Sequence, residues 1–511
     1  MLVKTYGSTL YGINATTITV EVNIGSKGVG YFLVGLPDSA VKESAHRINA
    51  ALKNIGYKVP KNKITINMAP ADLRKEGSAY DLTIAMGILA ASEQIEAEDI
   101  ENYIIMGELS LDGTVNPIKG VLPIAIQARS EGFKGFILPK ANAKEAAVVN
   151  DLKVYAVENI KEVVDFFDKT RDLEPTIVDT RQEFYANLAN FPFDFADVKG
   201  QENVKRAMEV AAAGGHNILL IGPPGSGKTM LAKRLPSILP PLSLQEALET
   251  TKIHSVAGKL HKDSSLMTAR PFASSHHTIS DVALVGGGSY PQPGEISLAH
   301  NGVLFLDELP EFQRSVLEVM RQPLEDREVT ISRAKFTVTY PASFMLVASM
   351  NPSPSGYFPD DPLNTSTAQE MQRYLNKISG PLMDRIDLHI EVTPVPFEEL
   401  SSDRNGVKSD VIRNRVEVAR ELQTRRYQNL DHVHYNAQMG PKELDAYCPL
   451  DQASQDLIKK AMDKLHLSAR AYDRILRVAR TIADLEHSEV LKSHHLAEAI
   501  QYRSLDKDKW I

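Results

Sequence analysis

The sequence is poor in cysteine: Cys448 is the single thiol among 511 residues. One thiol excludes an intramolecular disulfide and most structural zinc sites, and it fits a reducing cytosol. Long apolar runs are also lacking, since no stretch approaches the ~18 residues that span a bilayer, and the first residues contain no apolar signal segment. We therefore expect a soluble, cytoplasmic protein without a membrane partner.

An excess of one charge is lacking as well. The 57 lysines and arginines nearly balance 65 aspartates and glutamates, which leaves a net charge of −8. Any binding of nucleic acid must then come from local basic loops rather than from a global positive field. Internal repeats and low-complexity tracts are absent, and a hydrophobic fraction of 43% is ordinary for globular domains with large cores.

Hydrophobic patterns divide the chain into three predicted domains. An α/β domain is predicted over residues 1–165, a charged linker over 166–196, a second α/β domain over 197–394 and a helical part over 395–511. Within the first domain, strands are predicted at 31–35, 63–67 and 103–109, and helices at 38–55 and 80–92.

The most informative motif is a glycine-rich loop between the apolar run 217–221 and a helical pattern at 230–235. Strand, glycine loop and helix in this order form nucleoside triphosphate sites. Backbone N–H groups surround the phosphates, Lys228 reaches the β- and γ-phosphates, and the Thr229 hydroxyl ligates Mg²⁺. We therefore expect ATP and Mg²⁺ as cofactors. The predicted nucleotide-binding residues are Gly222, Pro223, Pro224, Gly225, Ser226, Gly227, Lys228, Thr229 and Met230.

Two further strand patterns end in polar residues suited to the same site. The apolar strand 302–306 is followed by Asp307 and Glu308, the Walker B pattern, in which Asp307 holds Mg²⁺ and Glu308 activates the attacking water. The strand pattern 344–350 ends at Asn351, where ATPases of the AAA+ class place a side chain that positions this water. On their own, a capping acid and an asparagine turn would explain these residues.

Two arginines are candidates for completing a catalytic site. Arg385 lies where the AAA+ class carries an arginine finger that acts on the nucleotide of the neighbouring subunit; a surface ion pair with Asp387 is the alternative. Arg470 begins a predicted helix from which a lid arginine would reach the nucleotide of its own subunit. At other phases of this helix, we expect three arginines to line solvent, an interface or DNA: Arg474, Arg477 and Arg480.

Several long motifs carry a family resemblance, at residues 201–207, 275–281, 293–302 and 378–387. They resemble the magnesium-chelatase-like AAA+ ATPases, most closely the ComM/YifB family, over essentially the whole chain. The resemblance implies a hexameric ring that hydrolyses ATP and acts on single-stranded or branched DNA, as a branch-migration helicase or translocase in the recombination of natural transformation.

The resemblance also implies the fold. The expected class is α/β, with a Lon-protease-like N-terminal α/β domain, a central AAA+ P-loop domain and a C-terminal all-α lid of the magnesium-chelatase type. The central domain is expected to carry a helix-2 insert and a pre-sensor-1 hairpin.

Candidate DNA contacts lie on two predicted loops. Paired strand patterns at 328–332 and 336–340 leave Arg333 and Lys335 at a hairpin turn, where cations could grip phosphates in a ring pore. Charged hairpin tips are also common simply because water solvates them. The second candidate is the turn at His300 and Asn301, beside the glycine-rich insert stretch. The adjacent histidines at 276 and 277 are poorly arranged to bind one metal ion.

The resemblance to Lon fails at the catalytic positions. Lon activates a serine with a lysine, but the matching positions here are Ala79 and Leu122, with Ser78 and Lys119 as neighbours. Moving a nucleophile by one residue re-aims its side chain. We therefore predict a proteolytically inactive domain that serves assembly or DNA engagement.

A second departure follows Asn351. Many relatives carry two Cys-x-Cys pairs there, which suit zinc. Hydroxyl groups are poor zinc ligands compared with thiolates, so we expect no zinc and a loop held by its prolines and neighbours. The residues at these positions are Ser353, Ser355, Asn364 and Ser366.

Other functions are compatible with parts of the sequence. An ATP-dependent protein remodeller or protease-like regulator is the alternative from a different class, and a magnesium chelatase subunit is the alternative among motors. The lost catalytic positions argue against a protease but not against a remodeller, and the Lon-like domain argues against the chelatase. Translocation polarity, preferred DNA structure, exact ring size and protein partners do not follow from the sequence.

Overall fold

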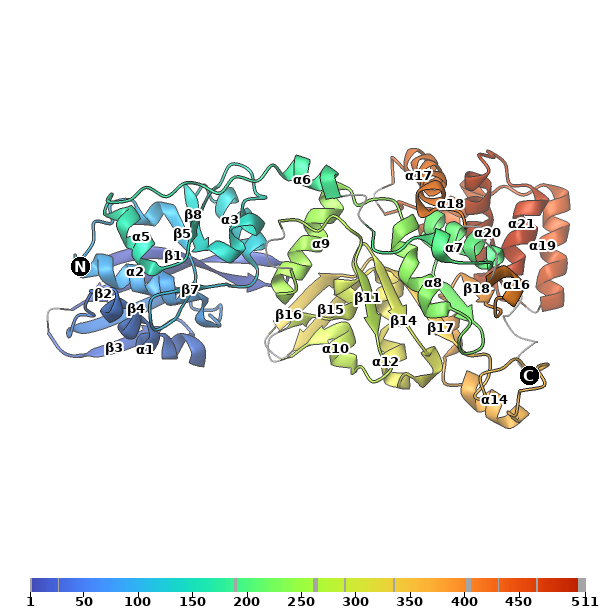
Figure 1. Ribbon diagram of the computed structural model, residues 1–511, viewed down its shortest axis with the longest axis horizontal. Helices are drawn as coiled ribbons and strands as arrows, with labels where there is room; N and C mark the ends of the chain where they lie inside the picture. Colours follow the sequence, from blue (N-terminus) through green and yellow to red (C-terminus); the bar gives the residue numbers. More distant parts are fainter. Residues whose placement is uncertain are drawn as a thin grey trace. The chain divides into compact units, whose positions relative to one another are not determined.

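The computed structural model of the protein (Figure 1) describes residues 2–25, 27–187, 191–260, 265–288, 291–333, 336–400, 406–430, 432–465 and 467–503. The chain folds into two compact units. The first unit contains Met1–Asn187 and Leu244–Thr268, and the second contains Leu188–Ser243 and Ala269–Ile511.

The first unit is built on a seven-stranded mixed sheet in the order β3-β4-β2-β1-β5-β8-β9. Its strands are β1 (Leu2–Tyr11), β2 (Asn14–Ile24), β3 (Gly30–Val34), β4 (Lys63–Ala69), β5 (Tyr103–Ile105), β8 (Gly135–Pro139) and β9 (Lys153–Val157). Alternation sets the buried face: in β4, Ile64, Ile66 and Met68 are buried while their neighbours are not. β1 and β2 form an antiparallel hairpin in which Leu2 pairs with Asn23.

Helices cover this sheet. They are α1 (Ser39–Asn54), α2 (Asp81–Ala91), α3 (Val121–Ser130), α4 (Ala143–Ala146), α5 (Ile160–Phe167) and α6 (Thr180–Asn187). α1 begins where the Asp38 carboxylate accepts a hydrogen bond from the Val41 N–H at 2.8 Å. All eleven residues of α2 are buried, as its uniformly apolar sequence requires, and it packs against β1 and β2.

The predicted elements of the first domain are confirmed, with two differences. The strand predicted over 103–109 divides, because β5 ends at Ile105 and the next pair, β6 (Glu108–Leu109) and β7 (Val115–Asn116), forms a separate small sheet. The hairpin of β1 and β2 was not predicted.

One helix joins the first unit from a distant part of the sequence. α9 (Leu244–Ala257) follows the predicted nucleotide loop along the chain, yet it packs against α3 and belongs to the first unit. The predicted domain over 197–394 is therefore interrupted by this excursion. The chain crosses between the units three times, after residues 187, 243 and 268.

The second unit contains a five-stranded parallel sheet in the order β11-β14-β17-β10-β18. Its strands are β10 (Ile218–Ile221), β11 (Phe272–Ser275), β14 (Val303–Leu306), β17 (Met345–Met350) and β18 (Leu388–Glu391). The central strands are buried along their whole length, which explains why their sequences are continuous apolar runs.

The remaining elements of the sheet domain are helices and two hairpins. The helices are α7 (Glu202–Gly214), α8 (Lys228–Arg234), α10 (Asp281–Val285), α11 (Glu295–Leu298), α12 (Arg314–Val319), α13 (Arg321–Asp326), α14 (Ala368–Leu375), α15 (Gly380–Met383) and α16 (Phe397–Leu400). The hairpins are β12 (Gly286–Gly287) with β13 (Gln292–Pro293), and β15 (Glu328–Arg333) with β16 (Phe336–Pro341).

A helical part completes the second unit. Its helices are α17 (Ser409–Arg426), α18 (Pro441–Tyr447), α19 (Gln452–Leu465), α20 (Ala469–Leu485) and α21 (Ser493–Gln501). α17 and α20 both pack against α7 (Figure 1). One apolar core runs from the sheet strands through α7 into these helices.

Candidate active site

The loop between β10 and α8 has the backbone that its glycines predict. Gly225 and Gly227 have φ values of 79° and 91°, which L side chains rarely adopt. Gly222 needs to be small for another reason: a Cβ there would lie 2.2 Å from the carbonyl oxygen of Val392. The loop therefore turns sharply from the sheet into the start of α8.

Lys228 lies inside this loop. Its ammonium group donates to the carbonyl oxygens of Gly222 at 2.6 Å and Pro223 at 2.9 Å, and to the Asn351 side-chain oxygen at 3.2 Å. Burial lowers the pKa of Lys228, and the nearby carboxylates of Asp307 and Glu308 partly oppose this shift. The Lys228 side chain thus lies between the glycine loop, which follows β10, and Asn351, which follows β17.

Thr229 and Asp307 are direct neighbours. The Thr229 hydroxyl donates to one carboxylate oxygen of Asp307 at 2.8 Å, and the Ser349 hydroxyl donates to the other. A hydroxyl at the end of the phosphate-binding loop and a carboxylate at the end of the neighbouring strand β14 are oxygen ligands that suit Mg²⁺. These residues fit the expected ion, with Ser349 orienting the carboxylate; the sequence did not indicate Ser349.

Glu308 has an unusual backbone and a neighbour that the sequence analysis missed. Its φ of 58° is left-handed, which is uncommon for a residue other than glycine. The Glu308 carboxylate is half-exposed and lies 3.3 Å from Nδ1 of His277. His277 lies two residues after the end of β11, so it reaches the same edge of the sheet as Glu308.

Asn351 follows β17 and is fixed on both sides. Its side chain accepts from Lys228, and its main-chain oxygen accepts from the Tyr374 hydroxyl at 3.2 Å. The structure therefore brings Lys228, Thr229, Asp307, Glu308 and Asn351 together at the carboxyl ends of three adjacent parallel strands. This edge is where open α/β sheets bind ligands.

Arg385 and Arg470 lie elsewhere. Asn217, which precedes β10, donates its side-chain N–H to the Arg385 carbonyl oxygen at 3.0 Å, so Arg385 is at the opposite end of β10 from the glycine loop. The Arg385 guanidinium is bonded to Glu325, and Arg470 lies 3.5 Å from Asp384. Both arginines line one cleft of 510 Å³. Arg470 thus lies beside Arg385 and away from the glycine loop of its own chain, which differs from the expectation that it reaches the nucleotide of its own subunit.

The other lid arginines correct an expectation. Arg474 is bonded to the buried carboxylate of Asp387, and Arg480 is itself buried, 3.1 Å from Asp484 through its Nε. Burial lowers the pKa of Arg477, the third of these arginines, below its ordinary value. Arg474 and Arg477 line the cleft of Arg385, so the expectation that the three arginines line solvent, an interface or DNA is wrong only for Arg480, which is buried against Asp484.

The two candidate DNA loops differ. Arg333 is exposed at the end of β15, as expected for a hairpin cation, whereas Lys335 lies outside the described residues. His300 is buried, its Nδ1 accepts from the Ser343 N–H at 3.1 Å, and the Asn301 N–H donates to the Ser343 carbonyl at 2.7 Å. This turn holds the chain before β17, which speaks against a DNA contact by His300 and Asn301.

The positions that correspond to the Lon dyad carry no such pair. Ala79 and Leu122 stand there; Leu122 is buried and its N–H donates to Glu145 at 2.9 Å. The neighbouring Ser78 donates to Glu108, whereas the Lys119 side chain lies against Gly258, beyond the end of α9. Ser78 and Lys119 therefore have different partners.

The loop after Asn351 is held by the four side chains that replace the cysteines of many relatives. The Ser355 hydroxyl donates to Asn364 at 2.7 Å and lies 2.9 Å from the Ser353 hydroxyl; the Ser366 hydroxyl accepts from the Ser355 N–H at 3.1 Å. A hydrogen-bonded cluster thus joins the start of the loop, residues 353–355, to its later part, residues 364–366.

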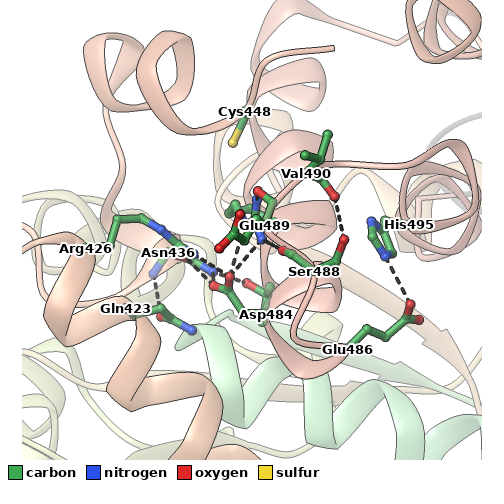
Figure 2. A network of polar contacts seen from close by, with 12 residues as sticks. Gln423, Arg426, Asn436, Cys448, Asp484, Glu486, Ser488, Glu489, Val490 and His495 are labelled. Carbon is green, nitrogen blue, oxygen red and sulfur yellow. Dashed lines mark hydrogen bonds and ion pairs between the residues drawn. The ribbon is translucent and has the colours of Figure 1, made fainter. Parts of the chain in front are cut away.

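Three described residues near the start of α21 have the types and spacing of metal ligands. Glu486, His494 and His495 place three potential ligand atoms within 4.8 Å of one another. However, His495 Nδ1 accepts from the Lys492 N–H at 3.0 Å, so its Nε2 carries the proton and donates to Glu486 (Figure 2). That nitrogen has no lone pair for a metal. We therefore interpret the three residues as a hydrogen-bonded cluster that joins the end of α20 to the start of α21.

The parallel sheet, glycine loop, Walker B carboxylates and helical lid define a P-loop ATPase fold of the AAA+ class. Within the part of the chain that the structure describes, no helix has the length and apolar character to cross a membrane. Three family descriptions match the sequence: "Subunit ChlI of Mg-chelatase" over residues 20–142, "Magnesium chelatase, subunit ChlI" over 194–400, and "Magnesium chelatase, subunit ChlI C-terminal" over 406–503.

Individual relatives place the chain more narrowly. It is 44% identical to the competence protein ComM of Haemophilus influenzae over 98% of this chain and 97% of the relative. It is 44% identical to the YifB protein of Escherichia coli over 97% and 96%. The chain belongs to the ComM/YifB family of magnesium-chelatase-like AAA+ ATPases. A shorter similarity, 32% over 155 residues, links it to Lon protease 2 of Bacillus subtilis, covering 30% and 27% of the two chains.

Proposed function

We propose that the protein is an ATP-driven motor that works on DNA as a ring, most specifically a branch-migration helicase or translocase in recombination during natural transformation. The observation that carries the ATPase part is the meeting of Lys228, Thr229, Asp307, Glu308 and Asn351 at one edge of the sheet. The likeness to a competence protein over nearly the full length of both chains supports the cellular role.

Each residue at this edge has a chemical task. Lys228 exchanges its contacts with loop carbonyls for phosphate oxygens when ATP binds. Thr229 and Asp307 would hold Mg²⁺, which neutralises charge that develops on the phosphates. Glu308 takes a proton from the attacking water, and Asn351 orients this water.

Arg385 supplies a further positive charge, and it supplies this charge to the nucleotide of the neighbouring subunit rather than to that of its own. Because Arg385 lies at the far end of β10 from the glycine loop, its phosphate target is the nucleotide of a neighbouring chain. An arginine finger contributes about 10³ to 10⁵ in rate, or roughly 4 to 7 kcal/mol of barrier. The site is therefore complete only in an assembled ring, which we propose is a hexamer.

The first unit is proposed to be proteolytically inactive and to serve assembly or DNA engagement. The hairpin of β15 and β16 is the proposed DNA contact, through Arg333 and Lys335. Arg333 is exposed at its end, where it can pair with a phosphate backbone of any sequence.

The test is ATPase activity measured in parallel with forked, single-stranded and duplex DNA. We expect single-stranded or forked DNA to raise turnover. Glu308→Gln should still bind ATP and assemble but lose turnover by about 10² to 10⁴, whereas Lys228→Ala should lose nucleotide binding. Wild-type turnover by Glu308→Gln would refute the assigned base, and indifference to every DNA would refute the DNA motor.

A protein remodeller is the second candidate, because the first unit is similar to part of a Lon protease. The same ATPase assay separates the two functions. Stimulation by an unfolded polypeptide such as casein, with no response to DNA, would favour the remodeller.

A further inference from the structure

The segment that carries Arg385 is fastened to the sheet through Asn217. The Asn217 side chain donates to the Arg385 carbonyl at 3.0 Å and accepts from the Leu346 N–H at 2.8 Å. Its main-chain oxygen accepts from the N–H groups of Asp387 at 3.0 Å and Leu388 at 3.1 Å. One residue thus joins the starts of β10, β17 and β18 to the backbone of the arginine finger.

Asp387 fastens the same segment to the lid. Its carboxylate is 2% exposed, accepts from the Asn217 N–H at 3.0 Å and is bonded to Arg474 on α20. Burial alone would raise the pKa of Asp387, but Arg474, His216 and Arg477 together hold it well below its ordinary value. The carboxylate therefore stays ionised, and pulling the lid cation away would leave a buried charge unpaired, which is costly.

His216 adds a second link between the same elements. It is fully buried, its Nε2 lies 2.8 Å from the Thr481 hydroxyl on α20, and its Nδ1 lies 3.5 Å from Asp387. The lid network continues from Thr481 through Asn436, which donates to Asp484 at 2.8 Å (Figure 2). The contact between finger segment and lid therefore extends into the lid interior.

The guanidinium of Arg385 has partners of its own. The side chain is 10% exposed; one N–H group donates to the Pro381 carbonyl and another bonds to Glu325, whose side chain is 58% exposed, while its Nε has no hydrogen-bond partner among the described residues. To act on a second chain, the guanidinium has to exchange Glu325 for a phosphate while Asn217 keeps the backbone of Arg385 in place.

We propose that Asp387 and Asn217 are positioning residues that join the arginine-finger segment and lid helix α20 into one rigid element. A lid displacement then carries Arg385 with it. Asn217 and Gly222 flank β10 and are five residues apart, roughly 16 Å at about 3.3 Å per residue, so the rigid element begins one short strand away from the chain's own phosphate loop. This inference rests on the proposed action of Arg385 on a neighbouring nucleotide.

The experiment uses full-length chains mixed into rings. Arg385→Ala chains keep the phosphate loop but lack the finger, whereas Lys228→Ala chains lack nucleotide but keep the finger. Mixing them should restore ATPase activity at junctions where Lys228→Ala donates its arginine. The test donor is Lys228→Ala/Asp387→Asn, and the measurement is the restored kcat and the KM for ATP.

The matched control donor is Lys228→Ala/Glu209→Gln. Glu209 is also a buried carboxylate, and it is paired at 2.5 Å with Arg415 of another lid helix, α17. We expect the Asp387→Asn donor to lose at least about 10-fold in restored kcat at unchanged KM, since a displaced finger affects rate rather than nucleotide binding. The Glu209→Gln donor should stay within about twofold of the parent.

Each outcome decides one claim. Equal rescue by the Asp387→Asn and parent donors would overturn the positioning role alone. Failure of the parent Lys228→Ala donor to rescue would overturn the action in trans, and the inference with it. If Asp387→Asn does not enter rings by gel filtration, a donor with Arg474→Gln takes its place and should show the same loss, whereas Arg474→Lys, which keeps the cation, should recover most of the rate.

Discussion

At the scale of single residues, the contact between His277 and Glu308 has the most direct consequence for chemistry. A general base works only if its carboxylate points at the water it deprotonates. Glu308 is half-exposed on a left-handed backbone, so few contacts hold its side chain, and His277 Nδ1 at 3.3 Å is one of them. We infer that His277 orients the base.

The His277→Leu variant should therefore lower kcat for ATP by about 10-fold, a part of the 10² to 10⁴ that a general base contributes, and leave KM unchanged. His276→Leu is the comparison variant: the His276 ring nitrogen faces Thr278 rather than Glu308, and leucine keeps an apolar side chain against the His277 ring, whose centroid lies 4.0 Å from that of His276. Steady-state ATPase kinetics measures both. Equal losses in the two variants, or a change confined to KM, would contradict the orienting role.

The sequence predicted the residues of the nucleotide edge because each one follows a strand of a single parallel sheet. Lys228, Asp307 and Asn351 are separated by long stretches of chain, yet their mutual position follows from strand order alone. His277 follows β11 in the same way, but a histidine after a short strand belongs to no motif. Arg480 was misread because helical phase alone does not show which face the neighbouring helices cover.

At the scale of elements, the loop between β17 and α14 offers a test of how side chains define its shape. Ser353, Ser355, Asn364 and Ser366 already converge through bonds of 2.7 to 3.1 Å. Thiolates at converging positions bind zinc tetrahedrally.

The variant S353C/S355C/N364C/S366C should bind one zinc ion per chain, and the wild-type protein none, by elemental analysis of the purified proteins. The three-cysteine variant that keeps Ser366 should bind zinc more weakly, because one thiolate is missing. Stoichiometric zinc in the wild-type protein would contradict the prediction, and so would a four-cysteine variant without zinc.

Elements with strong periodicity were predictable, and the exceptions have physical causes. The strand predicted over 103–109 divides at Gly107: the Met106 N–H still donates to Ile137 of β8, but the Gly107 N–H donates to Ala79 instead, a local event that an apolar run does not reveal. The hairpin of β1 and β2 did carry a signal that was not used: alternating runs flank Gly12, whose φ of 63° forms the turn. The sequence pattern could have predicted α9 as a helix, but not that it packs in the first unit.

At the scale of the whole molecule, α9 is tied to the first unit by a buried polar contact. Its residue Ser255 donates to the buried Glu145, and its main-chain oxygen accepts from the Gly120 N–H at 3.0 Å. Burial raises the pKa of Glu145, and Ser255 opposes this shift. Removing the hydroxyl therefore leaves a buried acid with one partner fewer.

Ser255→Ala should destabilise the first unit by about 1 to 3 kcal/mol, the contribution of a buried hydrogen bond to an acidic group. Limited proteolysis of the full chain, followed by identification of the cut sites, measures this as faster cleavage within residues 1–187. Ser130→Ala, which removes an exposed hydroxyl at the end of α3, should leave the rate unchanged. The prediction fails if both variants are cut at the wild-type rate.

The excursion of α9 also bears on how the chain matures. During synthesis, domains generally fold in order from the N-terminus, but residues 1–187 lack one of their own helices until position 257 has been translated. By then the glycine loop has also been translated, so the first β-strand of the ATPase sheet is made before the first unit can be completed. Residues 1–187 transplanted onto another protein would carry an uncovered α3 face with them, because α9 packs on that face.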